Sequence, residues 1–299
     1  MSCHRPEAMN ARLLRRASIV RRLGLLVVAV GLAGCGALGG ASPAPSGGAL
    51  THPTGATDLI LRYEQGGGFV PPGFLATEGP TFSLYGDGTA IFRNPRDANP
   101  VPDSTASPLI RGVPYQVAHL SELQVQAVLA YALDPGGLRA ADVHYERPIA
   151  DAPTTVFTID AGGIKKAVSI NGLGIDAASG KDAQILAKLT ALGTKLQGYG
   201  SEVSDEQPWS PDRYRGLLGE DSFNDPIPWP WPTISPSDFV ETTASTTLQF
   251  PMRTMTPAEV ARLGIAGVEG GLQGVSLKAP SGGKSYSFRL RPLLPDEAF

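Results

Sequence analysis

The chain has 299 residues, 42% hydrophobic and 18% charged, a composition that can bury a core and excludes a largely disordered protein. Its formal net charge of −3 is unevenly distributed, because residues 1–34 hold six arginines and one acidic residue. The rest of the chain has 19 basic and 27 acidic residues, a net charge of −8, which argues against a nucleic-acid-binding surface.

The first predicted element is an export signal over residues 1–34. The stretch "RRLGLLVVAVGLAGC" begins with arginines, continues with an apolar run from Leu23 and ends on small residues. The run holds about ten residues and a bilayer span needs about 20, so we expect a cleaved signal and no permanent transmembrane helix. The pairs Arg15-Arg16 and Arg21-Arg22 leave open whether export uses the general secretory or the twin-arginine route.

The signal ends in Leu32-Ala33-Gly34-Cys35, which resembles the lipobox of bacterial lipoproteins. In that class the thiol at the position of Cys35 receives a diacylglycerol and the signal is cut just before it. The resemblance implies a lipid anchor at Cys35 and a position on the extracytoplasmic side of the cell membrane. The alternative is an ordinary signal peptide that contains a cysteine. Cys3 leaves with the signal, so the mature body has no thiol for a disulfide, a nucleophile or a zinc site.

Residues 35–57 follow as a tether rich in Gly, Ala, Ser and Pro, which we expect to be flexible. Residues 58–202 are predicted to form a first α+β domain. It contains the strand "DLILRYE", a hairpin that turns at Gly86-Asp87-Gly88, and a helix that Ser121 and Gln124 begin as a capping box. A second hairpin turns at Ala161-Gly162-Gly163, and "KDAQILAKLTALGTKL" predicts a second helix.

A glycine-rich stretch, "EQGGGFVPPGF", separates the first strand from the first hairpin. A phosphate-binding loop would need backbone N–H groups that converge at a helix start, but here the glycines lead into Pro71 and Pro72, which have no N–H to offer. We therefore expect Gly66, Gly67 and Gly68 to provide positive φ angles at a bend.

Residues 203–237 are predicted to be a Pro- and Trp-rich crossover, and residues 238–299 a second α+β subdomain. Thr256, Pro257 and Glu259 predict a helix start, and "GVSLKAPSGGKSYSFRLR" predicts a closing hairpin. A helix followed by a hairpin thus occurs in each half, a pattern typical of two similar halves. The predicted fold class is α+β, with antiparallel hairpins and sheets packed with a few helices.

All three tryptophans, Trp209, Trp229 and Trp231, lie in the crossover. One interpretation is a stacking surface for a sugar or a peptide. The interpretation that we favour is that Trp229 and Trp231 are buried and join the two halves.

No pattern for a cofactor or a metal is present, because the histidines that remain after cleavage lack metal-ligand spacing. Nor does the sequence offer a recognisable catalytic triad. The carboxylates Asp87, Asp142 and Asp160 are the candidates for acid/base chemistry if the protein is an extracytoplasmic hydrolase of cell-wall or polysaccharide material.

Four phrases, "GGGFVPP", "FSLYGDGT", "DAPTTVFTI" and "LRPLLPDE", resemble a group of secreted or lipid-anchored bacterial proteins from high-GC lineages. The resemblance covers most of residues 58–297 and implies no particular activity, cofactor or site residue. The sequence as a whole predicts a lipoprotein of the cell envelope that is a non-enzymatic binding or scaffolding module, with an envelope protein or a glycan as its partner. The hydrolase is the alternative.

Overall fold

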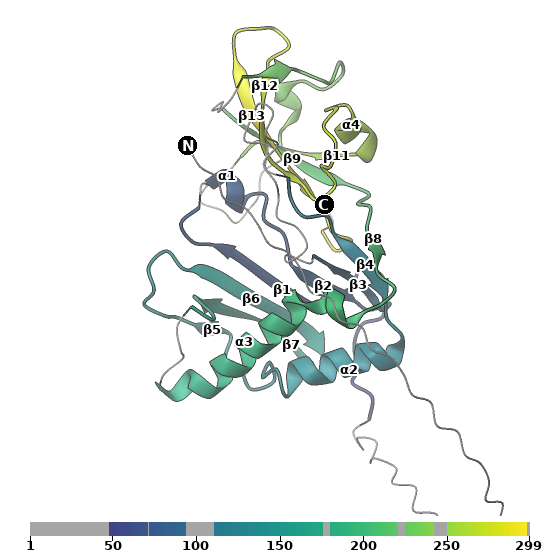
Figure 1. Ribbon diagram of the computed structural model, residues 1–299, viewed down its shortest axis with the longest axis vertical. Coiled ribbons are helices and arrows are strands. Elements are labelled where there is room, and N and C mark those ends of the chain that lie inside the picture. Colours follow the sequence, from purple (N-terminus) through teal and green to yellow (C-terminus); the bar gives the residue numbers. More distant parts are fainter. Residues whose placement is uncertain are drawn as a thin grey trace, which may run out of the picture. The chain divides into compact units, whose positions relative to one another are not determined.

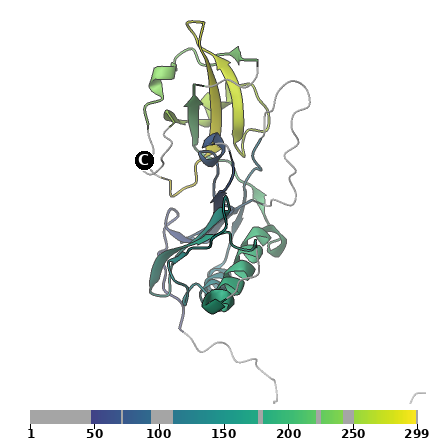
Figure 2. The same cartoon turned by 90° about the vertical axis from the view of Figure 1, so that its left-hand side faces the viewer.

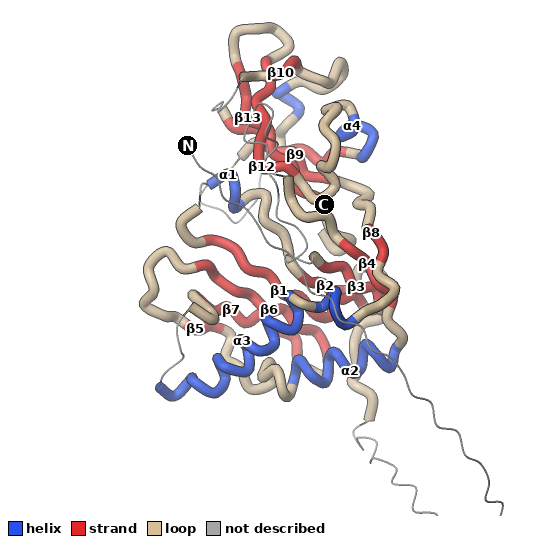
Figure 3. Tube along the Cα trace, in the orientation of Figure 1, coloured by secondary structure: helices blue, strands red, loops and turns tan. Residues whose placement is uncertain are grey.

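The computed structural model describes residues 48–70, 72–93, 111–175, 180–220, 225–241 and 250–297. Its strands form two sheets, of eight and five strands, accompanied by four α-helices in these residues (Figure 1, Figure 3). Most neighbouring strands are antiparallel, so the predicted α+β class is confirmed. Both sheets belong to one compact unit, residues 47–299.

The first sheet has the strand order β5-β7-β6-β1-β2-β3-β4-β8. Its strands are β1 (Leu59–Gly67), β2 (Phe82–Tyr85), β3 (Thr89–Phe92), β4 (Gln116–His119), β5 (His144–Tyr145), β6 (Pro153–Ala161), β7 (Ile164–Asn171) and β8 (Gln207–Pro208). The two hairpins predicted from glycine turns are confirmed as β2–β3 and β6–β7, whose turn glycines Gly88, Gly162 and Gly163 have positive φ angles.

Two long helices, α2 (Glu122–Leu133) and α3 (Ala183–Gln197), cover one face of this sheet (Figures 1 and 2). The predicted capping box of Ser121 and Gln124 is confirmed at the start of α2. Alternate residues of β1, β2, β6 and β7 face the helices, among them Tyr63 and Phe157, whose ring centroids lie 5.2 Å apart. A Cβ at Gly193 of α3 would lie 3.3 Å from the Tyr63 ring, so this glycine lets the helix approach the sheet closely.

The second sheet has the order β10-β12-β13-β9-β11. Its strands are β9 (Tyr214–Gly219), β10 (Ile227–Pro228), β11 (Met252–Met255), β12 (Leu272–Lys278) and β13 (Ser285–Pro292). The helix α4 (Pro257–Ala261) begins at Thr256, which accepts a hydrogen bond from the backbone N–H of Glu259, as predicted. The remaining short helices are α1 (Pro72–Leu75) and the 3-10 turns η1 (Gly180–Asp182), η2 (Tyr199–Glu202) and η3 (Pro236–Asp238).

The segment 203–237, which we expected to be a loop-rich crossover, contains β9. This strand lies between β13 and β11, so it is an interior strand of the second sheet. Its six residues are bounded by Pro-rich segments and follow no clear alternation of apolar and polar residues, which is why the sequence pattern did not reveal it.

A helix followed by a hairpin does occur in both halves, as α2 with β6–β7 and as α4 with β12–β13. The hairpins join their sheets differently. In the first sheet the first hairpin strand, β6, pairs with β1, whereas in the second sheet the second hairpin strand, β13, pairs with β9. The halves therefore share an order of elements along the chain but differ in strand connectivity.

Residues 50–57, which we expected to belong to the flexible tether, are bound to the first sheet and its helices. Leu50 packs against the core, and its backbone N–H and C=O bond to the side chain of Gln126. The C=O of Thr51 accepts from the N–H of Gly162, and His52 contacts Glu122 at 3.3 Å. A single apolar residue and a few polar contacts fix this segment, and composition alone did not reveal them.

The glycines of the opening stretch act through backbone geometry. Gly67 and Gly68 have φ angles of +83° and +85°, which end β1 and turn the chain. A Cβ at Gly68 would lie 3.0 Å from the carbonyl oxygen of Asp151, so a side chain would be crowded there. The predicted bend is confirmed at Gly67 and Gly68, whereas Gly66 lies within β1 and does not have the positive φ angle that we expected.

Candidate functional site

The three carboxylates predicted for acid/base chemistry lie in different surroundings. Asp87 is in the β2–β3 turn, where its carboxylate accepts the backbone N–H of Thr89 at 2.9 Å. Asp142 is exposed in the loop before β5. Asp160 lies on β6 directly opposite Lys165 of β7, and the two side chains form an ion pair of 2.7 Å. Of the three, Asp160 alone lines the pocket described next.

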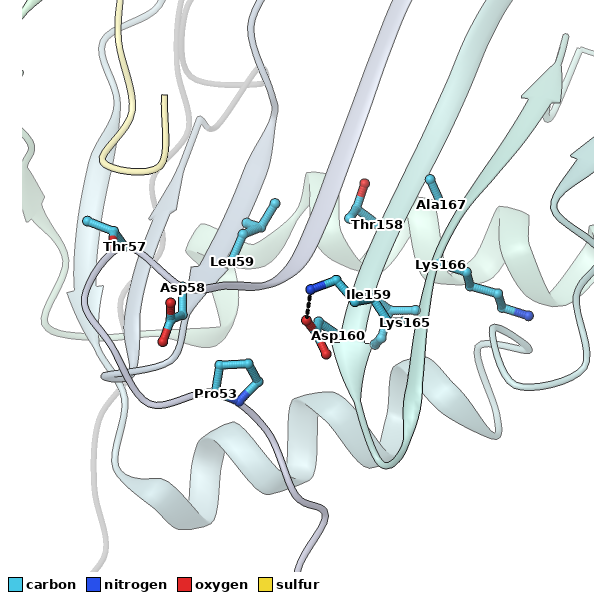
Figure 4. A pocket seen from close by; sticks show the side chains of 10 residues that line it. All are labelled: Pro53, Thr57, Asp58, Leu59, Thr158, Ile159, Asp160, Lys165, Lys166 and Ala167. Carbon is cyan, nitrogen blue, oxygen red and sulfur yellow. Dashed lines mark ion pairs between the residues drawn. The ribbon is translucent and has the colours of Figure 1, made fainter. Parts of the chain in front are cut away.

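This pocket, of about 500 Å³, lies where the segment before β1 meets the β6–β7 hairpin (Figure 4). Its walls are partly apolar, from proline, leucine, isoleucine and alanine, and partly polar, from two threonines, two aspartates and two lysines. The lining residues are Pro53, Thr57, Asp58, Leu59, Thr158, Ile159, Asp160, Lys165, Lys166 and Ala167.

The turn of the β6–β7 hairpin positions one charged pair in the pocket. It places Asp160 directly opposite Lys165 on the neighbouring strand, close to the turn at Gly162. Their side chains therefore project from the same face of the hairpin. The hydrogen bond to Asp160 raises the pKa of Lys165, with a smaller contribution from Asp58. Lys165 is 83% exposed, so solvent screens this pair and it contributes little to stability.

The second carboxylate, Asp58, is held by a local turn. It accepts the backbone N–H of Gly55 at 2.8 Å, while its own N–H donates to the C=O of Gly55 at 3.1 Å. The C=O of Asp58 accepts from Gly86, which ties this turn to the β2–β3 hairpin. The sequence interpretation did not consider Asp58 as a site residue, because it took this residue as the first of the ordered domain. The only local signal for the turn was the spacing from Gly55 to Asp58, in which glycine stands where an asparagine would mark a polar turn more clearly.

Lys166 lines the pocket but its ammonium is used elsewhere. Its Nζ donates to the C=O of Ala141 at 2.5 Å, and Figure 4 shows the side chain directed away from Asp160. Burial lowers the pKa of Lys166. The charges that face the pocket are therefore those of Asp58, Asp160 and Lys165.

Two carboxylates, one ammonium and two threonine hydroxyls offer both acceptors and donors to a polar ligand with hydroxyl or amino groups. Both carboxylates already accept hydrogen bonds or form an ion pair within the protein. Among the described residues, no three His, Cys, Asp or Glu side chains gather as a metal site would require.

The three tryptophans do not form one surface. Trp231 is 2% exposed, donates its Nε1–H to the C=O of Glu259 at 2.7 Å, and packs on Phe288. Trp229 is partly buried beside it, with ring centroids 5.2 Å apart, and donates to the C=O of Ile234. Trp231 belongs to the core of the second sheet and Trp229 packs against that core, so the expected burial is met for Trp231 and only in part for Trp229, and neither joins the two halves.

Trp209 is the tryptophan that lies at the junction of the two halves. Its ring stacks edge-on against Tyr115, with centroids 5.6 Å apart. It belongs to a small cluster that includes Tyr85 of the first sheet and Leu294 from beyond the last strand of the second sheet. The sequence interpretation gave this joining role to Trp229 and Trp231 instead, because all three tryptophans share a Pro-rich context.

The export signal, residues 1–34, and Cys35 lie outside the described residues. Within the part of the chain that is described, no helix is both long enough and apolar enough to cross a bilayer. No family model matches the chain, and neither the curated proteins nor the solved structures contain a match.

Proposed function

We propose that the protein is a lipoprotein of the bacterial cell envelope, anchored through Cys35, whose body is a non-enzymatic binding or scaffolding module. The sequence Leu32-Ala33-Gly34-Cys35 supports the anchor, and the order of arginines, apolar run and small residues before it supports export. The body on the extracytoplasmic side then meets envelope proteins and glycans.

The observation that carries the binding role is the state of the two carboxylates in the pocket. General acid/base catalysis needs a carboxyl group that is free to exchange a proton with the substrate. Asp160 is engaged by Lys165 and Asp58 by the N–H of Gly55, so both carboxylates already have partners within the protein and present oriented hydrogen-bonding groups. Such a pocket suits reversible recognition of a polar ligand, such as a sugar or a short peptide.

The hydrolase remains the second candidate, because Asp58 and Asp160 do line one pocket. A glycoside hydrolase uses two carboxylates on either side of the scissile bond. In that case Lys165 would have to leave Asp160 when substrate binds.

One experiment separates the two functions. An N-acetylglucosamine oligosaccharide and a library of short cell-wall peptides are titrated into the protein by calorimetry, and the same mixtures are assayed for released fragments. We expect binding without release. The double variant Asp58→Asn, Asp160→Asn should weaken binding at least about tenfold, equivalent to about 1.4 kcal/mol, because both fixed acceptors lose their charge.

The matched control is Asp142→Asn, an exposed acid that does not line the pocket, which should bind as the wild type does. Fragment release that Asp160→Asn abolishes would establish the hydrolase. Equal binding by the wild type and the double variant would show that this pocket is not the ligand site.

A further inference from the structure

The chain's own C-terminal segment, Leu293–Glu297, contacts the face of the first sheet that the helices leave open. Strand alternation defines this face. On β1, Leu61 and Tyr63 belong to the helix-side core, so Arg62 and Glu64 point to the opposite side. On the neighbouring strands the same side carries Tyr85 and Ile91.

The first contact of the segment is apolar. Leu294 is completely buried in a cup of apolar and aromatic side chains from the first sheet and the loops beside it. The cup consists of Leu59, Tyr85, Ile91, Tyr115, Val117 and Trp209.

The second contact is a carboxylate site. Oδ1 of Asp296 accepts from Nη2 of Arg62 at 2.6 Å and from the hydroxyl of Tyr85 at 2.6 Å. The guanidinium of Arg62 is itself held in place by a bond from its Nε to Oγ of Ser83. The Arg62 and Asp296 side chains are 11% and 17% exposed, so this charged pair is largely shielded from solvent.

The segment adds no strand to the sheet. The N–H of Leu293 donates to the C=O of Arg213. Beyond Leu293, the backbone hydrogen bond among the described residues lies within the segment itself, from the N–H of Glu297 to the C=O of Leu294. The carboxylate of Glu297 also closes this turn, by accepting the N–H of Leu294, and bonds Arg291. Two side chains, Leu294 and Asp296, therefore make the contacts to the first sheet that define the segment's position.

We propose that the cup and the Arg62–Tyr85 pair form a recognition site for a peptide that carries a leucine and, two residues later, a carboxylate, and that Leu293–Glu297 occupies this site in cis. A buried apolar anchor beside a desolvated charged anchor is how short peptides are recognised with few backbone contacts. The site complements its occupant in charge, since Arg62 is its cation and Asp296 the segment's anion.

This inference deepens the proposed binding role by naming the chemistry of a peptide partner. It uses neither the Asp58–Asp160 pocket nor the lipid anchor, so its failure would leave those parts of the proposal unaffected. Because a tethered occupant acts at an effective concentration of about millimolar, an external peptide binds only when the cis segment is weakened or displaced.

The test uses a fluorescent pentapeptide, Leu-Leu-Pro-Asp-Glu, and the full chain. Binding is measured by anisotropy to the wild type and to the variant Leu294→Ala, Asp296→Asn, in which both contacts of the cis segment are weakened. We expect the variant to bind at least tenfold more tightly than the wild type. A control peptide, Leu-Leu-Pro-Asn-Glu, should bind the variant at least tenfold more weakly, and adding Arg62→Gln should remove the preference for aspartate.

Circular dichroism establishes whether each variant is folded. If the double variant is unfolded, the single variant Asp296→Asn, which is milder, replaces it in the binding measurement. A folded variant that binds neither peptide, or both equally, overturns the proposal. If Asp296→Asn alone unfolds the chain, the segment is an indispensable part of the fold and not an exchangeable occupant, which overturns it as well.

Discussion

At the scale of single residues, Glu64 is placed where a charge is costly. It projects from β1 on the same side as Arg62, and its carboxylate forms no hydrogen bond or ion pair with the described residues. Burial raises the pKa of Glu64. The positive charges of Arg62 and Arg291 oppose that rise, and the nearby acids Glu297 and Asp296 add to it. Two arginines and two acids already balance each other here, so an ionised Glu64 leaves one negative charge in excess.

The variant Glu64→Gln should therefore be more stable than the wild type at neutral pH. A carboxyl group whose pKa is higher in the folded protein binds its proton more tightly there, so stability falls as the pH rises from the unfolded value of about 4.3 through the folded one. Glutamine removes this loss. We expect the urea midpoints of the two proteins to converge below about pH 4 and to separate at pH 7, with the variant higher.

The control for this comparison is Glu220→Gln, because Glu220 is 83% exposed and pairs with Lys284 on the surface. It should change the midpoint little at any pH. A Glu64→Gln protein that is less stable than the wild type at pH 7 would show that the charged form of Glu64 has a stabilising partner.

Sequence reasoning named one of the two carboxylates of the candidate pocket. Asp160 was one of three candidate acids, and it lies beside the glycine turn of a predicted hairpin, a feature that is local in the chain. Its neighbour Asp58 reaches the pocket only through the pairing of β1 with β6, and the contact of Arg62 with Asp296 joins residues 234 positions apart. Contacts of this kind depend on how strands pair, and no local pattern specifies that.

At the scale of elements, the structures predicted correctly are those with local causes. Glycines fix the turns of β2–β3 and β6–β7, and side-chain caps fix the starts of α2 and α4. The strand β9 was missed because its stability comes from two long-range partners, β13 and β11. The different attachment of the two hairpins is likewise a property of sheet assembly.

The segment with Trp229 and Trp231 illustrates an element held by side-chain packing. We expect Trp231→Ala to lower the free energy of unfolding by about 3 to 5 kcal/mol, because its ring is buried and its N–H bond is lost. Trp229→Ala should cost less, since that ring is partly exposed. Urea unfolding curves of the two variants measure the difference.

The matched variant Trp231→Phe keeps an aromatic ring but has no N–H to donate to Glu259. Its free energy of unfolding should therefore lie between those of the wild type and Trp231→Ala. Unfolding curves that coincide for the wild type and Trp231→Ala would mean that Trp231 does not hold this segment on the second sheet.

At the scale of the whole molecule, the part of the chain beyond residue 34 has a net charge of −8. Anionic lipid surfaces repel such a body, so electrostatics do not hold it at a membrane. A covalent lipid at Cys35 would supply the attachment. Gly48, where the described residues begin, lies thirteen positions after Cys35, and a fully extended chain of that length reaches at most about 45 Å.

Membrane attachment should therefore depend on one thiol. In cells fed a labelled fatty acid, we expect the wild type to be labelled and to sediment with membranes, and Cys35→Ala to lose the label completely. Cys3→Ala is the matched control, since the proposed cleavage removes Cys3, and it should behave as the wild type does. A single acyl chain binds membranes only marginally, so the two chains of a diacylglycerol are needed for stable attachment. Labelling that persists in Cys35→Ala would contradict the lipid anchor, and the protein would then have to be held at the envelope by its binding partner.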